Sequence, residues 1–373
     1  MGEKVRIGFV GVGWMGEQLF EKLVKNPDAT IVGLSEKNSA RAEEILLRYG
    51  LSKNLLVENY EDLLERKDVN AVVLASPNAF HGPQAVRALE TGKHVFCEKP
   101  AATKYRDFLR QVELDSANPN LATFIDYILY FDEMENRLHK MVREGAFGQI
   151  VQIQVNYRHP VNIKADKVWK LKKDVVGDGI GMGPIHAIFL TLWHMEEDEP
   201  IAVHACSMEA KVRPFEVPPI WNIMIEFKSG ATGIIQGNID SGNRYDAYHN
   251  LWGTKGEFVF DSQTEDAFKV KYWSESLTGG KWVYPLNAEL TEAKYLWPNL
   301  KTPDSGEVIH HQTQECTSHF VSLVKEGKKS PLGFANSRRV AEIGFAAIVS
   351  DRLGHERVRL PLDKSLALAT LGE

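Results

Sequence analysis

The chain has 373 residues, of which 43% are hydrophobic, 10% aromatic and 25% charged. This composition is typical of folded globular proteins and excludes a disordered chain, a collagen-like chain and a disulfide scaffold. The length exceeds what one hydrophobic core usually organises and favours two domains. A net charge of -6 has the wrong sign for a nucleic-acid partner, so we expect none.

The first 130 residues alternate short apolar runs with helical patterns, which predicts a doubly wound parallel sheet with crossover helices. The predicted strands are Val5 to Val10, Thr30 to Leu34, Leu55 to Val57, Ala71 to Ala75, His94 to Cys97 and Ala122 to Ile128. The predicted helices are Met15 to Lys25, Ser39 to Tyr49, Tyr60 to Arg66, Gly82 to Thr91 and Lys104 to Ser116. We therefore expect an α/β Rossmann domain over residues 1–126.

A different pattern begins near residue 130, where an amphipathic segment (Met134 to Glu144) is followed by alternating, β-branched and aromatic runs. The predicted strands are Val151 to Tyr157, Ala202 to Ala210, Asn222 to Phe227, Gly233 to Gln236, Glu257 to Phe260, Phe268 to Trp273 and Trp282 to Tyr284. Two helices, Gln314 to Glu326 and Ser337 to Leu353, are predicted to close the chain. Residues 127–373 should form an α+β domain with a large, mostly antiparallel open sheet.

Directly after the first predicted strand, Gly11, Gly13 and Gly16 form a G-x-G-x-x-G pattern that encloses Trp14 and Met15. The glycines permit a tight turn, close approach of the backbone to a pyrophosphate, and close packing of helix on strand. The following helix N-terminus favours the negative charge of the phosphates. The pattern indicates a bound dinucleotide.

Glu36 ends the second predicted strand, where an acidic side chain accepts hydrogen bonds from the adenosine ribose. A carboxylate at this position repels a 2′-phosphate, which favours NAD over NADP as the cofactor. The neighbouring Lys37 weakens this preference, because its charge could tolerate the phosphate.

Two further segments follow the fourth and fifth predicted strands and should border the cofactor, because ligands bind beyond the carboxyl ends of parallel strands. The first contains Ser76, Pro77, Asn78 and His81, and the second is Glu98-Lys99-Pro100. A lysine beside a cationic nicotinamide ring has a lowered pKa and can exchange protons. A cis bond at Pro100 could fix the direction of Lys99. Glu98 is expected to orient Lys99 or to contact the cofactor.

These three motifs, in this order, resemble the glucose-fructose oxidoreductase, inositol dehydrogenase and rhizopine-catabolism (Gfo/Idh/MocA) family. Further similar segments are Asp126 to Phe131, Gly145 to Gly148 and Gly253 to Gly256. The resemblance implies a pyridine-nucleotide oxidoreductase that acts on a sugar, cyclitol or related polyol. It also implies a Rossmann domain and a second domain whose open sheet forms contacts in a homo-oligomer, a dimer or tetramer.

By the same resemblance, Lys99 and His186 are the candidate catalytic residues, since each can exchange a proton during hydride transfer. The chain departs from the pattern where Met182 takes the position of an aspartate, Pro184 that of a glycine and Phe189 that of an acidic residue. Asp174 or Asp178 could replace the missing carboxylate if either reached the site. A further departure is Tyr130, which replaces an arginine.

Tyr127 and Trp169 are candidates for the substrate pocket with Met182, because aromatic faces suit the C–H faces of sugars. Core packing is the alternative for Tyr127, and a satisfied core histidine is the alternative for His186. Two other functions stay open: a glycosidase that uses NAD transiently, and a regulatory protein that binds the nucleotide without turnover.

The sequence predicts no metal site and no membrane span. Its three cysteines, Cys97, Cys206 and Cys316, are far apart and fit free thiols in a reducing compartment. The histidines near the C-terminal helix also lack a tight ligand spacing; they are His310, His311 and His319. Because no run of eighteen apolar residues and no signal-like segment occurs, we expect a cytoplasmic protein.

Overall fold

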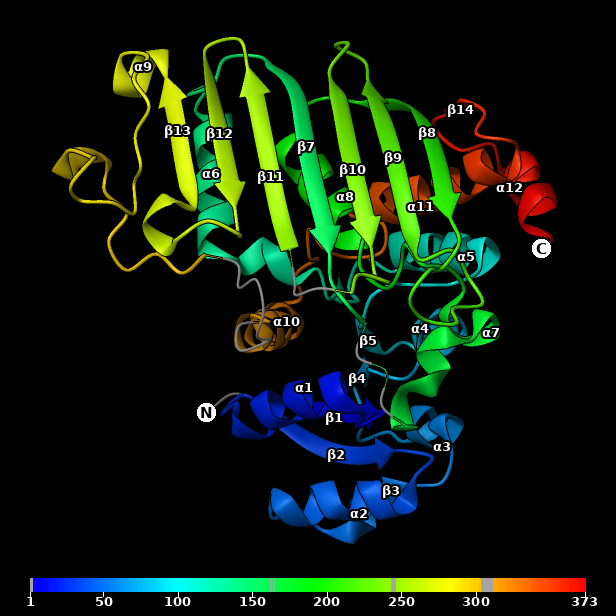
Figure 1. The fold of residues 1–373 in the computed structure, drawn as a ribbon. Helices are drawn as coiled ribbons and strands as arrows, with labels where there is room; N and C mark the ends of the chain where they lie inside the picture. The colour runs from blue at the N-terminus through cyan, green and yellow to red at the C-terminus, as the bar shows by residue number, and fades with distance from the viewer. Residues whose placement is uncertain (1–2, 162, 164, 243–245, 303–310) are drawn as a thin grey trace.

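The computed structural model describes residues 3–161, 163, 165–242, 246–302 and 311–373, and its two sheets lie in separate layers (Figure 1). The first sheet has six parallel strands in the order β3-β2-β1-β4-β5-β6. Their bounds are β1 Val5–Val10, β2 Ala29–Ser35, β3 Leu56–Val57, β4 Ala71–Leu74, β5 His94–Cys97 and β6 Thr123–Ile125. This order confirms the predicted doubly wound α/β fold.

The helices of this half are α1 Trp14–Lys25, α2 Ser39–Arg48, α3 Tyr60–Glu65, α4 Asn78–Glu90 and α5 Tyr105–Ala117. Helix α4 starts at Asn78, four residues before the predicted start at Gly82. The helix passes through Gly82-Pro83, since Gly82 lets α4 pack closely on α5: a Cβ at Gly82 would lie 2.9 Å from the Asp107 Cβ.

The second sheet has eight strands in the order β13-β12-β11-β7-β10-β9-β8-β14. Among the described residues its pairings are antiparallel except for β7 with β10, which confirms the predicted mostly antiparallel sheet. The bounds are β7 Ile150–Arg158, β8 Pro200–Met208, β9 Ile220–Phe227, β10 Thr232–Asn238, β11 Asp246–Gly253, β12 Gly256–Asp261, β13 Val270–Ser274 and β14 Val358–Arg359.

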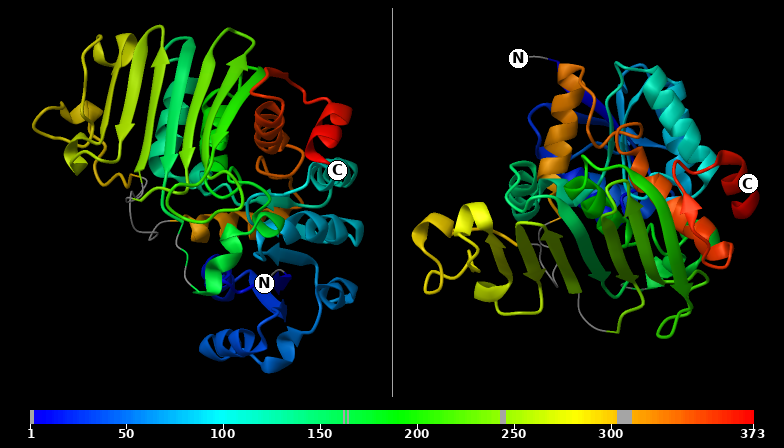
Figure 2. Two further views of the ribbon diagram at one scale, coloured as in Figure 1. Left: turned by 45° about the vertical axis from the view of Figure 1, so that its right-hand side comes forward. Right: turned by 90° about the horizontal axis from the view of Figure 1, so that it is seen from above.

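Helices cover one face of this sheet and leave the other face bare (Figures 1 and 2). The covering helices are α6 Glu133–Arg143, α8 Ile185–His194 and α11 Arg338–Arg352. The strands alternate accordingly, with apolar side chains beneath the helices and Gln152, Gln154 and Asn156 of β7 on the bare face. The remaining helices are α7 Lys173–Val176, α9 Glu275–Thr278, α10 Thr313–Glu326 and α12 Lys364–Leu371.

Two strand predictions in this half were wrong. The prediction omitted β11, in which the inward position 249 is a histidine rather than an apolar residue. His249 is nevertheless buried, with its ring 5.6 Å from that of Phe258. The predicted strand Trp282 to Tyr284 is reduced to one bridge between Val283 and Tyr272.

Helix α10 and the segment that follows it return to the first sheet. Helix α10 packs against α1, the Phe320 ring lies 5.6 Å from the Phe96 ring, and the Ile125 N–H donates to the Leu332 carbonyl at 2.8 Å. The boundary between residues 126 and 127 stays a prediction. No helix among the described residues combines the length and apolar character that a membrane span requires.

A buried acidic cap begins α6. The Asp132 carboxylate accepts the Glu135 N–H at 3.0 Å, and the Glu135 carboxylate lies 3.0 Å from His194 Nε2. Burial, together with the charge of Glu135, raises the pKa of Asp132 to about 8. The folded protein therefore holds a proton here that the unfolded chain releases near pH 4.

Replacing this group tests the shift. Because the native state retains the proton, stability from Asp132 is lost as the pH rises from about 4 to about 8. Asp132→Asn keeps a capping side chain without that loss. We expect the variant to exceed the wild type in stability at pH 8 by at least about 1 kcal/mol and to match it at pH 4. Urea unfolding at both values measures this, and a difference that is independent of pH would contradict it.

Candidate functional site

The turn between β1 and α1 needs its glycines for different reasons. Gly11 has φ +85°, and a Cβ there would lie 2.7 Å from the Ala75 carbonyl oxygen. A Cβ on Gly16 would lie 2.1 Å from the Gly11 oxygen, so helix and turn are in close contact. A Cβ on Gly13 would meet nothing within 4 Å, and α1 begins there without a side-chain cap. The turn thus leaves space and amide groups for an anion.

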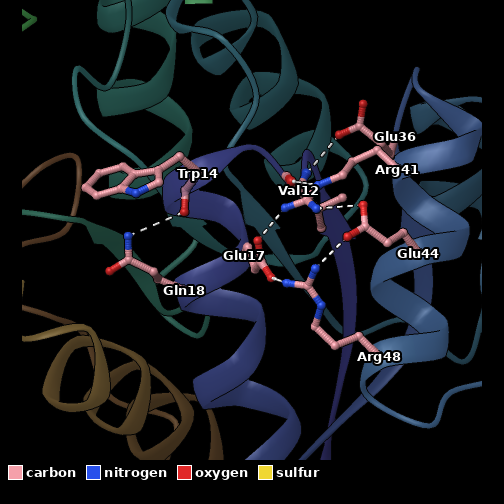
Figure 3. A network of polar contacts seen from close by, with 8 residues as sticks. All are labelled: Val12, Trp14, Glu17, Gln18, Glu36, Arg41, Glu44 and Arg48. Atoms are coloured by element: carbon pink, nitrogen blue, oxygen red, sulfur yellow. Dashed lines mark hydrogen bonds and ion pairs between the residues drawn. The ribbon is translucent and has the colours of Figure 1, made fainter. Parts of the chain in front are cut away.

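Glu36 faces this turn from the end of β2. Its carboxylate accepts the Val12 N–H at 2.8 Å (Figure 3). It also accepts the Asn38 N–H at 3.0 Å. The predicted acid is therefore at the glycine turn, where its remaining lone pairs can accept hydrogen bonds from ribose hydroxyls.

The cations near Glu36 are engaged elsewhere. Arg41 and Arg48 of α2 both pair with Glu17 and Glu44, as Figure 3 shows. Exposed Lys37 places its Nζ 5.0 Å from the centre of the Phe80 ring. Among the residues predicted to contact the cofactor, Lys37 is thus the one whose charge could interact with a 2′-phosphate.

The segment after β4 is tied to the segment after β5 by a buried imidazole. His81 lies between two carbonyl oxygens, that of Ser76 at 2.7 Å and that of Pro100 at 2.8 Å. Pro77 precedes α4, and the Asn78 Nδ2 lies 3.6 Å from the Met182 sulfur of the second half. His81 therefore holds the Glu98-Lys99-Pro100 segment against the segment that follows β4.

Lys99 is held by both halves of the protein. The Lys99–Pro100 bond is cis, as the sequence allowed, and the Lys99 Nζ donates to the Met182 carbonyl at 3.1 Å. A Cβ on Gly181 would lie 2.7 Å from the Pro100 ring, so the glycine loop must approach closely. Burial lowers the pKa of the Lys99 ammonium, and the carboxyl of Glu98 opposes that shift.

His186 enters the same site as the second residue of α8. Its ring is buried, lies 5.4 Å from the Tyr157 ring, and keeps Nδ1 without a hydrogen-bond partner within the described structure. Burial, reinforced by the charge of Lys99, holds the pKa of His186 well below its usual range. The structure thus brings Lys99 and a neutral His186 together.

No carboxylate of the preceding loop takes the place of the missing aspartate. Asp178 accepts the Gly181 N–H at 2.9 Å and so caps its own turn, while Asp174 is exposed. Burial raises the pKa of Asp178 to about 6. Met182 therefore contributes its carbonyl oxygen to Lys99 and no charge.

Two histidines that the sequence analysis did not assign also face Lys99. His159 directly follows β7, and burial with the charge of Lys99 lowers its pKa to about 3. The same two causes lower the pKa of His311 to about 4, and its ring lies 5.6 Å from that of Trp14. His159 could have been suspected from its place at a strand end. His311 gave no such signal, because it reaches the site from just before α10.

The other predicted residues lie around this centre. Tyr127 is fully buried and its ring stacks 5.1 Å from Phe189, whereas Trp169 lies half-exposed in a turn at 165–171. Lys170, beside Trp169, is close enough to His159 to lower its pKa further, although burial is the main cause. The substrate roles of Tyr127 and Trp169 stay predictions.

The histidines considered as metal ligands are spread apart. His319 packs against the rings of Phe124 and Phe131, and His310 lies outside the described residues. Over the part of the chain that the structure describes, no three histidine, cysteine or acidic side chains are arranged to hold a metal ion.

Profiles of one protein family match both halves of the chain. The profile of the Gfo/Idh/MocA oxidoreductase family with an NAD-binding Rossmann fold matches residues 5–123, and that of the family's C-terminal domain matches residues 136–259. The chain belongs to the Gfo/Idh/MocA family. Its members include the myo-inositol 2-dehydrogenase of Thermotoga maritima, which is 25% identical over 92% of this chain and 95% of that protein.

Other Gfo/Idh/MocA relatives differ in how much of the chain they match. A glycosyl hydrolase family 109 protein of Phocaeicola vulgatus is 30% identical, but over 46% of this chain and 34% of its own length. The solved structure of levoglucosan dehydrogenase with NADH is 23% identical, covers 97% of this chain and 100% of its own, and has a TM-score of 0.79. The two-layer fold of this chain is thus that of the family.

The glycine turn of the Gfo/Idh/MocA fold allows a matched pair of substitutions. In Gly16→Ala the new methyl group meets the Gly11 carbonyl, so we expect a loss of about 2 kcal/mol or more in unfolding free energy. In Gly13→Ala the methyl group enters open space, so stability should change by less than about 0.5 kcal/mol. NAD binding should nevertheless weaken, because that space is where the pyrophosphate approaches.

Urea unfolding and calorimetric titration with NAD separate the two effects. Equal destabilisation by both substitutions, or undiminished NAD binding by a folded Gly13→Ala protein, would contradict the assignment of the turn.

Proposed function

We propose that this protein is an NAD-dependent oxidoreductase that transfers a hydride between the nicotinamide and a secondary alcohol or ketone of a sugar, cyclitol or related polyol. The observation that carries the proposal is the meeting of Lys99, from the end of β5, with His186, from the start of α8. Lys99 follows β5, which lies beside β4 in the first sheet, and His186 belongs to the other half.

The residues at the edge of the first sheet fit the dinucleotide. Gly13 leaves open space at an uncapped helix N-terminus for the pyrophosphate, and Glu36 offers a carboxylate for the adenosine ribose. Pairing of Arg41 with Glu17 and Glu44 leaves little positive charge for a 2′-phosphate apart from Lys37. This arrangement favours NAD over NADP.

Proton transfer is assigned to the side chains that face the reacting carbon. When bound, the nicotinamide supplies the hydride acceptor for oxidation and the donor for reduction. In oxidation, Lys99 in its amine form takes the hydroxyl proton, and burial, which lowers its pKa, makes that form accessible. Neutral His186 holds the hydroxyl by hydrogen bonding or receives the proton in its place. Reduction reverses these transfers.

The proposed substrate class follows from the neutral polar groups around Lys99. His159, His186 and His311 are neutral imidazoles, and a neutral imidazole has one donor and one acceptor nitrogen, although His159 already makes a hydrogen bond with the main chain at Pro160. Such groups suit neighbouring hydroxyls of an uncharged polyol better than a carboxylate or phosphate. The Thermotoga maritima and levoglucosan enzymes act on a cyclitol and an anhydrosugar by name, in agreement with this class.

The glycosidase alternative is not favoured, because the glycosyl hydrolase relative matches less than half of this chain whereas the dehydrogenases match over nine-tenths. A purely regulatory role is not favoured either, since both proton-transfer residues are present.

The proposal includes a homo-oligomer formed through the bare face of the second sheet, where Trp252 of β11 is 51% exposed. If the oligomer forms through this face, Trp252→Lys should weaken it, and light scattering would measure the fall in molecular mass. The three free cysteines support a cytoplasmic location.

Lys99→Met tests the main proposal. The variant should bind NAD within about twofold of the wild type yet lose at least about 100-fold in kcat, because the proton acceptor is gone. Activity is measured as NADH absorbance with myo-inositol, scyllo-inositol, levoglucosan and glucose. Lys104→Met, a change at an exposed lysine close in sequence, serves as the control. Undiminished turnover by Lys99→Met would refute the role of Lys99, and no turnover by the wild type with a broad polyol panel would refute the proposed function.

Glu36→Ser tests cofactor choice. Removal of the carboxylate abolishes its hydrogen bonds to the ribose and its repulsion of a 2′-phosphate. The ratio of kcat/KM for NAD to that for NADP should fall at least about tenfold, or roughly 1.4 kcal/mol. Glu44→Gln, which alters the neighbouring ion pairs but not the acid facing Val12, should leave the ratio within about twofold. Equal ratios for the wild type and Glu36→Ser would contradict the assignment.

A further inference from the structure

Two carboxyl groups leave the first sheet side by side beneath Lys99. Strands β5 and β6 are paired in parallel with Cys97 opposite Ile125, so the next residues, Glu98 and Asp126, emerge at the same edge. The Asp126 N–H donates to the Cys97 carbonyl at 2.9 Å, which fixes this register beyond the strands. Glu98 is 8% exposed and Asp126 is 1% exposed. Strand pairing therefore places two acids together out of contact with solvent.

The two carboxyl groups have few partners. One oxygen of Glu98 accepts the Lys99 main-chain N–H at 3.1 Å. Apart from each other and the Cys316 thiol, the other oxygen of Glu98 and both oxygens of Asp126 have no hydrogen-bond partner among the described residues, and all three oxygens are buried. Two adjacent carboxylates in such a setting cannot both ionise without a large cost. Burial is the main cause that raises the pKa of each, and the charge of Asp126 raises that of Glu98 further.

The titratable groups that face this pair include one basic amine. Lys99 lowers the pKa of both carboxyls, His81 adds a smaller effect on Glu98, and the Cys97 and Cys316 thiols lie beside the pair. Burial raises the pKa of both thiols, so they are neutral at ordinary pH and contribute no charge. Desolvation lowers the pKa of buried His81, although the Pro100 and Ser76 carbonyls at its two ring nitrogens oppose that shift. Lys99 is thus the main charge to which the pair responds.

We propose that Glu98 and Asp126 share a single proton, and that the one negative charge left on the pair stabilises the ammonium form of Lys99 in the reaction. The inference rests on the proposed role of Lys99 in hydride transfer. The pair thus supplies a negative charge from the first sheet. This charge stands in for the aspartate whose position in the second half is taken by Met182. Glu98 and Asp126 are positioning residues, since neither needs to touch the substrate.

The proton balance is simple. During oxidation the substrate O–H bond breaks and an N–H bond forms on Lys99, while the hydride leaves the same carbon for the nicotinamide. The new positive charge on Lys99 is compensated by the negative charge already present on the carboxyl pair. The pair keeps its one proton throughout, so no further donor or acceptor is needed in this step.

The pattern of single and double substitutions distinguishes a shared proton from other charge states. When Asp126→Asn or Glu98→Gln removes one acid, the new amide replaces the protonated carboxyl as the hydrogen-bond donor and the remaining acid carries the single negative charge, so the total charge stays at one. The pKa of Lys99 should therefore move by less than about half a unit in either single variant. In the double variant the charge is gone, and the pKa of Lys99 should fall by about one unit or more.

The pKa of Lys99 can be followed without turnover, by carbon NMR of the full-length protein labelled at lysine Cε, with Lys99→Arg used to assign the signal. Infrared difference spectra between neutral and alkaline pH provide a second readout, in which both single variants should lose the carboxyl band of the shared proton and keep the band of protonated Asp132. Asp178→Asn is the matched control, because this half-buried acid is engaged by Gly181 and its replacement should leave Lys99 unchanged.

Each other outcome has a definite meaning. Equal drops in the pKa of Lys99 in the two single variants would indicate two ionised carboxylates, and no drop in the double variant would indicate a neutral pair; either result overturns the proposal. If the expected pattern appears but Lys99→Met retains full turnover, the shared proton stands and the proposed function of Lys99 fails. The two hypotheses can thus be judged separately.

Discussion

The contact between Pro100 and Gly181 is the constraint on which the site depends. It presses the segment after β5 against the loop before α8, and it leaves no room for a side chain at position 181. The same approach brings the Lys99 amine to the Met182 carbonyl and close to His186. His81 supports the arrangement from the other side by bridging Ser76 and Pro100. The reactive groups of the two halves are thus set by main-chain packing rather than by long, adjustable side chains.

Electrostatics in this site are governed by burial more than by pairing. Three imidazoles and one amine face each other, and each loses affinity for protons because its charged form is poorly solvated. A site with four positive charges would repel an oxidised nicotinamide, whereas mostly neutral nitrogen bases would accept it. Glu98 and Asp126 oppose the trend at Lys99 alone, so one nitrogen is distinguished from the other three.

Much of the first half could be predicted from the sequence, because its signals are local. Gly11, Gly13, Gly16 and Glu36 lie within one βαβ unit, and the structure places the acid at the glycine turn as expected. His159 and His311 could not be placed in this way, since their proximity to Lys99 depends on how distant segments pack. The missed strand β11 shows a related limit: hydrophobic periodicity fails where a histidine, here His249, fills an inward position. Asp126 was visible in the sequence, but its partner became evident once the β5–β6 register was known.

The return of α10 to the first sheet has a consequence for biosynthesis. Phe320 completes the aromatic packing around Phe96, and Leu332 continues the hydrogen bonding beyond β6, yet both are translated roughly 200 residues after the strands they support. A ribosome making 5–20 residues per second delivers them about 10 to 40 seconds later. During that interval the nascent nucleotide-binding half exposes an apolar flank that chaperones could recognise. Completion of this half is therefore coupled to synthesis of the chain as far as Leu332.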